Sequence, residues 1–195
     1  MYDYDEKVYV PNLVETFSKA KERNGAFGNM TGGFPLIVGN VRANCSESLY
    51  QSLRFTSYPN LQREILPLGG MGCKMSSKKY RKDFTRSDWD DVRVDFMEWV
   101  IRVKLACHPI NFGLLLLATQ GRQIVEFSKK DSFWGAKPQV DGTLKGQNVL
   151  GQILMKVRDD YRSDRANGVE IYKTVRPVDV ENFSLYGNPI GVLTF

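Results

Sequence analysis

The chain has 195 residues, of which 42% are hydrophobic and 25% charged, as is ordinary for one globular domain. Its longest purely apolar run, residues 114–118, is far shorter than the roughly 20 residues of a membrane-spanning helix. The acidic first residues lack the apolar core of a signal peptide, so we expect a cytoplasmic protein with no membrane partner. The formal net charge of +5 favours approach to a polyanion or a phosphorylated ligand.

The histidine and cysteine content limits which kinds of catalytic and metal site are expected. The single histidine, His108, precedes Pro109 at a predicted helix end, where its imidazole would cap the last carbonyls. A Ser-His-Asp triad or a histidine-rich metal centre is therefore not expected. Cys45, Cys73 and Cys107 form no CxxC pair, which predicts reduced, mostly buried thiols. Because no GxGxxG motif or P-loop is present either, we expect no cofactor and no metal.

In the first half of the chain, hydrophobic periodicity and turn residues predict mostly helices. Residues 7–22 fit a short strand or a helix equally well, and residues 24–40 fit a loop and hairpin with a strand at 35–38. Helices are predicted from residue 44 or 46 to about 56, at about 60–66, at 74–82, and from a Ser87 cap to about His108.

The second half continues the pattern with a helix over residues 112–119 and a strand over 123–127. Residues 128–145 are expected to form a loop, followed by a helix over about 148–162, and residues 168–195 are expected to form two strands. No internal repeat or low-complexity linker is present. These elements predict a helix-rich α+β fold with a small β-sheet, in a single domain over residues 1–195.

One face of the helix after residue 44 carries a polar triplet. Glu47, Gln51 and Arg54 follow one another at i, i+4 and i+7 and so share a face. A carboxylate suits proton transfer or hydroxyl binding, and a guanidinium suits phosphate. Glu47 also follows Asn44 by three residues, which is the spacing of a helix-capping pair, so a capping role stays open.

Several other residues are compatible with ligand binding. Trp134, beside Gly135 in a loop, can stack on a base or belong to the core. Asp131, in the same loop, would supply a second carboxylate for proton transfer. The backbone amides of residues 146–148 precede a helix and can bind an anion. The basic run over residues 74–86 fits a phosphate-facing patch and a solvated helix face about equally well.

An ordered series of motifs resembles the NADAR family over about residues 25–162, and leaves residues 163–195 as a C-terminal extension. The matching motifs are Phe27-Gly28-Asn29-Met30, Ser46-Glu47, Tyr50-Gln51, Arg54-Phe55, Trp89-Asp90, Met97, Lys104-Leu105, residues 115–119, Val125-Glu126, Asp131-Ser132-Phe133-Trp134-Gly135, residues 146–151 and residues 154–158.

The resemblance implies a hydrolase that cleaves N-glycosidic bonds. One branch of the family is similar to riboflavin-pathway N-glycosidases, which act on ribosylamino-pyrimidine phosphates. The other is similar to DNA ADP-ribosyl glycohydrolases, which remove ADP-ribose from guanine bases and serve as antitoxins to a DNA ADP-ribosyltransferase toxin. Residues 25–34 and 131–136 look closer to the second branch, and Ser48 departs from the histidine that often follows the glutamate in the first. The expected partners are thus guanine-ADP-ribosylated DNA, ADP-ribose and a toxin encoded alongside.

The resemblance also implies roles for individual residues. Glu47 and Asp131 would be the catalytic carboxylates. The implied substrate contacts are Phe27, Trp89 and Trp134 as aromatic walls, Arg54, Lys104 and the 146–148 backbone at the pyrophosphate, and Asn29, Gln51, Gly135 and Asn148. Two alternatives remain, a non-catalytic ADP-ribose-binding module and a basic nucleic-acid-binding domain without sugar chemistry.

Overall fold

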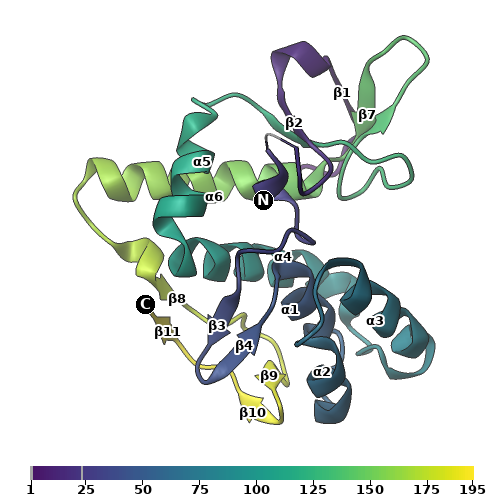
Figure 1. Cartoon of the computed structure of the whole chain (residues 1–195), viewed down its shortest axis with the longest axis vertical. Helices are drawn as coiled ribbons and strands as arrows, with labels where there is room; N and C mark the ends of the chain where they lie inside the picture. The colour runs from purple at the N-terminus through teal and green to yellow at the C-terminus, as the bar shows by residue number, and fades with distance from the viewer. Residues whose placement is uncertain (1, 23) are drawn as a thin grey trace. The chain divides into compact units, whose positions relative to one another are not determined.

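The structure, a computed structural model, describes residues 2–22 and 24–195 (Figure 1). Groups of short strands and groups of helices follow one another along the chain, so the prediction of a helix-rich α+β fold is confirmed. The residues group into two compact units: unit 1 takes its residues from Met1–Gly28 and Pro109–Val169, and unit 2 from Asn29–His108 and Glu170–Phe195. The prediction of one domain over the whole chain stays a prediction.

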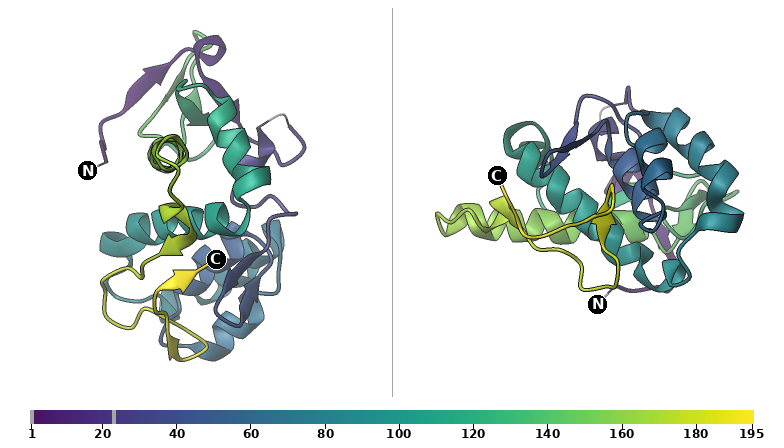
Figure 2. Two further views of the ribbon diagram at one scale, coloured as in Figure 1. Left: turned by 90° about the vertical axis from the view of Figure 1, so that its left-hand side faces the viewer. Right: turned by 90° about the horizontal axis from the view of Figure 1, so that it is seen from below.

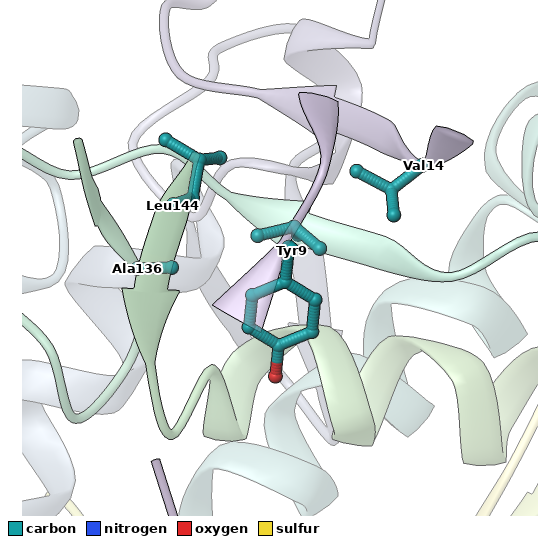
Figure 3. Close-up of a cluster of buried hydrophobic side chains, with 5 residues drawn as sticks. Tyr9, Val14, Ala136 and Leu144 are labelled. Atoms are coloured by element: carbon teal, nitrogen blue, oxygen red, sulfur yellow. The ribbon is translucent and has the colours of Figure 1, made fainter. Parts of the chain in front are cut away.

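Unit 1 contains two small sheets built from distant parts of the chain. Strands β1 (Lys7–Tyr9), β7 (Leu144–Gly146) and β6 (Lys137–Pro138) form an antiparallel sheet in the order β1-β7-β6, and β2 (Glu15–Phe17) runs parallel to β5 (Ile124–Glu126). Residues 7–22, which fitted a strand or a helix, thus contain the short strands β1 and β2, with a 3₁₀ turn between them. Figure 3 shows part of the cluster that Tyr9, Val14, Val125, Ala136 and Leu144 bury between these strands.

Helix α6 (Val149–Ala166) packs closely on β5, and this contact explains the glycine at position 151 in its first turn. A Cβ atom at Gly151 would lie 2.1 Å from the carbonyl oxygen of Ile124, so only glycine fits there. Asn148 donates from Nδ2 to that same carbonyl at 2.8 Å and accepts the Glu126 amide at 3.0 Å. In the left view of Figure 2, α6 is seen nearly end-on with α5 (Leu114–Ala118), which it contacts, beside it.

The remaining elements of unit 1 are single turns. The described residues form the 3₁₀ turns Pro11–Leu13 and Gly25–Phe27 and a π-helical turn, Pro109–Gly113, that leads into α5. The predicted helix over residues 112–119 is therefore confirmed, although its first turn is π-helical.

Unit 2 is built around the short helix α1 (Ser46–Leu53), all eight residues of which are buried. It contacts α2 (Pro59–Ile65), α3 (Gly70–Phe84) and α4 (Trp89–Cys107), the blue and teal helices of Figure 1. The hairpin β3 (Leu36–Val38) and β4 (Val41–Ala43) precedes α1. The end of the chain adds a 3₁₀ turn, Ile171–Lys173, and the strands β8 (Thr174–Val175), β9 (Ser184–Leu185), β10 (Asn188–Pro189) and β11 (Leu193–Thr194).

Several predicted elements need correction. Helix α3 begins at Gly70, earlier than the predicted residue 74, and α6 extends beyond the predicted residue 162 to Ala166. The tail forms four short strands in two pairs, β8 with β11 and β9 with β10, where two strands were expected. The predicted loop over residues 128–145 contains β6 and most of β7, joined by a turn in which Gly142 has a φ of 81°.

The predicted ends of α4 also differ in detail. Its N-cap is Asp88, one residue after the predicted Ser87, and the Asp88 carboxylate binds Arg86 instead of the helix amides. At the other end the helix stops at His108 as predicted, but the imidazole Nε2 lies 2.7 Å from the Pro35 carbonyl and does not cap the helix. The helix carbonyls are instead bonded by the backbone amide of His108.

The cysteines are free thiols; Cys45 and Cys73 are buried and Cys107 is partly exposed, which confirms that prediction. Within residues 2–22 and 24–195, no single helix is long and apolar enough to cross a membrane. The successive helical stretches Trp89–Cys107 and Pro109–Ala118 reach that length and composition only when they are taken together across a break.

Candidate functional site

Glu47 lies in the first turn of α1 and is only 8% exposed. Its carboxylate Oε1 accepts a hydrogen bond from Gln51 Nε2 at 2.9 Å, as their i, i+4 spacing predicts. The capping role that the sequence left open is wrong. Cys45 is the N-cap, and the reciprocal bonds of the cap involve Ser48, whereas Asn44 donates to the Pro67 carbonyl. The Glu47 carboxylate therefore does not cap the N-terminus of α1.

A chain of hydrogen bonds leads from Glu47 across to α3. Gln51 Oε1 accepts from Ser77 Oγ at 3.0 Å and from Arg81 Nη2 at 3.1 Å, and Arg81 also reaches Ser77 at 3.2 Å. We call Glu47, Gln51, Ser77 and Arg81 the Glu47 network. Because the amide of Gln51 is held at both ends, the carboxylate of Glu47 is fixed in one orientation.

The electrostatic surroundings of Glu47 differ from those of a surface carboxylate. Burial raises the pKa of Glu47, and this effect is opposed by the charge of Lys74, by the bond from Gln51 and by the charge of Arg81. A carboxylate with a raised pKa is a stronger base than an ordinary one and holds a proton to higher pH. Such a group suits proton transfer at neutral pH.

Asn29 and Ser46 each place a buried oxygen atom close to Glu47. The Glu47 amide donates to the carbonyl oxygen of Asn29 at 2.9 Å, and Ser46 precedes Glu47 in the chain. Among the residues that the structure describes, Asn29 Oδ1 and Ser46 Oγ have no partner, although Asn29 Nδ2 contacts Met97 Sδ at 3.1 Å. Buried polar atoms are normally satisfied, so these two can receive a ligand or a water molecule.

Arg54 and Trp89, which were predicted to contact the substrate in separate roles, contact each other in unit 2. The guanidinium carbon of Arg54 lies 3.9 Å from the centroid of the Trp89 ring, a cation–π stack. Trp89 is only 5% exposed and also packs against Tyr50 at 5.1 Å and Phe96 at 6.0 Å between ring centroids. Trp89 therefore positions Arg54, whereas the sequence suggested that its ring would form an aromatic wall.

Lys104 is fully buried on α4, with Nζ 4.8 Å from the centroid of the Phe34 ring. Burial lowers the pKa of Lys104 to about 7, an effect that the nearby Cys45 partly opposes. At neutral pH the amine therefore carries less charge than an ordinary lysine. This weakens its predicted role as a pyrophosphate contact and suits it to exchanging a proton.

The other predicted site residues, Asp131, Trp134, Gly135, Asn148 and Phe27, belong to unit 1. Asp131 Oδ1 accepts the backbone amides of Phe133 and Trp134, both at 2.9 Å, so this carboxylate shapes its own turn. The side chain of Trp134 is half-buried beside Phe133. A Cβ at Gly135 would lie 2.5 Å from the Glu126 carbonyl, so close packing requires this glycine. Ligand roles for these residues stay predictions.

The backbone at the start of α6 does not offer the open amides that the sequence suggested. The amides of Gln147, Asn148, Val149 and Leu150 donate to the carbonyls of residues 132–135 at 2.7 to 3.2 Å. The prediction of an anion site at the 146–148 backbone is therefore wrong, because these groups bind the preceding loop. The side chain of Asn148 is likewise engaged with β5.

Phe27 is a core residue in the structure. It is 1% exposed, and its ring packs edge-on against Phe17 and Phe112 at centroid distances of 5.9 and 6.4 Å. With both neighbours in contact, the ring presents no open face for a ligand within unit 1, in contrast to the predicted aromatic wall.

Sequence reasoning missed some residues close to Glu47, notably Ser46, Ser77 and Arg81. Ser77 and Arg81 share a face of α3 at i, i+4, and the periodicity of that helix would have separated them from the exposed lysines around them. Ser46 lies next to Glu47 and was predicted as part of the Ser46-Glu47 motif and as a possible helix start, but with no site role. Ser46 is buried by tertiary contacts, and such burial leaves no pattern in the sequence that would mark it as a site residue.

Comparison with known proteins shows the family to which the chain belongs. The family model described as "NADAR domain" matches residues 16–162. A riboflavin biosynthesis protein of Vibrio vulnificus is 29% identical over 94% of this chain, and the chain spans 49% of that protein's length. The protein named N-glycosidase YbiA in Escherichia coli is 27% identical over 76% of this chain and 88% of its own length.

A solved structure supports the same assignment at the level of the fold. The solution NMR structure of Escherichia coli YbiA superposes with a TM-score of 0.62 at 25% identity, and covers 78% of this chain and 88% of that one. The family model accounts for most of the chain and includes the Glu47 network. The chain belongs to the NADAR domain family.

Proposed function

We propose that this protein is an N-glycosidase, a hydrolase that cleaves the bond between C1 of a ribose and the nitrogen of a base. The observation that carries the proposal is Glu47, a buried carboxylate held by Gln51 beside oxygens of Asn29 and Ser46 that have no partner among the described residues. The names of the relatives that act as N-glycosidases support the same reaction class.

The proposed chemistry assigns a task to each of these groups. As the C–N bond lengthens, ribose C1 gains positive charge, and the carboxylate of Glu47 stabilises it and accepts a proton from the attacking water. The water oxygen bonds to C1, and the base nitrogen leaves with the bonding electron pair and takes up one proton, which balances the proton that the water gave to Glu47. Asn29 and Ser46 would bind ribose hydroxyls. Asp131 stays a candidate second carboxylate.

For the substrate, we favour ADP-ribose attached to guanine bases of DNA. The exposed face of α3 carries Lys74, Lys78 and Lys82 at i, i+4 and i+8, which we call the lysine stripe. None of the three forms an ion pair within the part of the chain that the structure describes. The charge of Lys74 acts on Glu47, so a polyanion bound along the lysine stripe would extend toward the Glu47 carboxylate.

This substrate would make the protein the antitoxin of a DNA ADP-ribosyltransferase toxin acting in the cytoplasm. The second candidate substrate is a ribosylamino-pyrimidine phosphate of riboflavin biosynthesis. It is favoured by the names of the relatives from Vibrio vulnificus, Arabidopsis thaliana and Zea mays. Both candidates share a phosphorylated ribose joined to a base nitrogen, so the same groups around Glu47 would serve either reaction.

The deciding experiment incubates the protein with a guanine-ADP-ribosylated oligonucleotide and, separately, with the ribosylamino-pyrimidine phosphate. Release of free ADP-ribose or ribose phosphate is followed by chromatography. We expect release of ADP-ribose from the oligonucleotide. Cleavage of the pyrimidine compound alone would replace the preferred substrate by the second candidate. Binding of ADP-ribose without cleavage of either compound would identify a non-catalytic reader and contradict the proposal.

A further inference from the structure

Three arginines from different helices of unit 2 gather around Tyr50. Arg54 ends α1, Arg81 belongs to α3 and Arg93 to α4, and the charges of all three act on the Tyr50 hydroxyl. Burial, together with the charges of Arg81 and Arg93, lowers the pKa of Arg54 to about 10. We call Arg54, Arg81 and Arg93 the arginine cluster.

The carboxylate that interacts with Arg54 is itself exposed to solvent. Asp90 interacts with Arg54 and lies 3.6 Å from Arg93 Nε, but its side chain is 88% exposed and therefore strongly screened. Among residues 2–22 and 24–195, the buried Nε atoms of Arg54 and Arg81 have no hydrogen-bond partner. Positively charged guanidinium groups that lie close together repel one another. An anion that accepts hydrogen bonds from Arg54 and Arg81 would offset this repulsion.

The geometry of the donors suits phosphate oxygens. A guanidinium is a planar fork that can bind two oxygens of one phosphate, and it stays charged under physiological conditions. Trp89 holds the Arg54 fork in a fixed plane by stacking at 3.9 Å, so less side-chain freedom is lost when an anion binds. A carboxylate ligand would bring one negative charge, whereas a phosphate or diphosphate brings about two.

We propose that the arginine cluster binds the phosphate or diphosphate of the substrate, and that Arg81 joins this site to Glu47 through Gln51. This inference rests on the proposed function for the identity of the substrate. Arg81 donates to Gln51 Oε1 at 3.1 Å, and Gln51 donates to Glu47 at 2.9 Å. A bound phosphate thus fixes the residue that orients the carboxylate, so that substrates lacking the phosphate are cleaved poorly.

The test is isothermal titration calorimetry of the whole protein with inorganic pyrophosphate and, separately, inorganic phosphate at low salt. The variants are Arg54→Gln, Arg81→Gln and Arg93→Gln. Lys79→Gln removes the same charge from an exposed position of α3 outside the cluster and is the matched control. Each arginine variant should bind at least about tenfold more weakly, because a hydrogen bond to a charged group is lost. Lys79→Gln should stay within about twofold.

Two further variants separate the possible outcomes. Arg54→Lys keeps the charge but loses the fork and should bind with intermediate affinity if the fork matters. Glu47→Gln should bind pyrophosphate like the unaltered protein.

Binding of pyrophosphate without cleavage of any substrate would overturn the proposed function and leave this inference standing. Equal losses in Lys79→Gln and the arginine variants, or no loss in any of them, would overturn the inference. Tighter binding of pyrophosphate than phosphate supports a diphosphate, and the reverse supports a phosphate monoester.

Discussion

Lys104 is a buried amine whose titration links stability to pH. Its pKa falls from an ordinary value of 10.5 to about 7, because burial disfavours the charged form. Between these values the unfolded chain binds a proton that the folded protein lacks, so this group makes the protein more stable as the pH rises from about 7 to about 10. The maximum slope is about 1.4 kcal/mol per pH unit.

The corresponding variant is Lys104→Met, which keeps the length of the side chain and removes the titration. Urea unfolding at several pH values should show the variant to be the more stable protein near pH 7, with the gap closing toward pH 10. A difference between the two proteins that does not change with pH would show that Lys104 is charged in the folded state. Cys45, which lies close to Lys104, is unchanged in both proteins.

At the scale of residues, the sequence predicted what depends on helical spacing. Glu47 and Gln51 contact each other because i, i+4 residues lie on one face, and Arg54 lies one turn further on. The environment of these residues was beyond prediction, because it is supplied by other helices. Arg81 reaches Gln51 only through the packing of α3 on α1, and its neighbours in sequence are exposed lysines. Phe27 matched a family motif, yet burial in the core decides what its ring can contact.

At the scale of elements, the contact of α6 with β5 depends on Gly151. Replacing it by alanine would place a Cβ atom 2.1 Å from the Ile124 backbone oxygen, and the backbone cannot yield as a side chain can. Gly151→Ala should therefore lower the free energy of unfolding by about 1–3 kcal/mol, the usual cost of overpacking. Urea denaturation followed by circular dichroism measures the change.

Gly32→Ala is the control for this prediction, because a Cβ atom there meets nothing within 4 Å. Its free energy of unfolding should change by no more than about 0.5 kcal/mol. If Gly151→Ala were as stable as Gly32→Ala, the close approach of α6 to β5 would be wrong.

The elements that the sequence predicted best are the long ones. Helix α6 buries one stripe over many turns and α4 is mostly buried, so both carry a long series of apolar residues at helical spacing. Helix α3 was predicted too short because Gly70 and Gly72 disfavour a helix on their own, whereas packing against α1 and α2 supports one here. The β6–β7 hairpin has a usable signal, Asp141-Gly142, a pair typical of tight turns that was assigned to a loop.

At the scale of the whole molecule, the prediction of a helix-rich α+β fold was correct, but the pairing of its strands was not accessible. Strand β2 pairs with β5, and β1 pairs with β7, across more than a hundred residues of chain. Strands of two or three residues carry too little periodicity to select a distant partner. The family, in contrast, was recognisable from ordered motifs alone, and the match over residues 16–162 agrees with it.

The central claim is that Glu47 carries out the cleavage of an N-glycosidic bond, and turnover of the Glu47→Gln variant tests it most directly. The substitution keeps the shape of the side chain and removes its charge and basicity. Glu64→Gln is the matched control, because Glu64 is an exposed carboxylate on α2 that accepts bonds from Ser76 and Tyr80. Activity is measured on whichever of the two candidate substrates the protein cleaves.

We predict that Glu47→Gln lowers kcat by at least about 100-fold, within the range for loss of a general base. Glu64→Gln should remain within about twofold of the unaltered protein, as expected for a surface group. Glu47→Gln protein that folds normally and turns over the substrate at the rate of the unaltered protein would contradict the account.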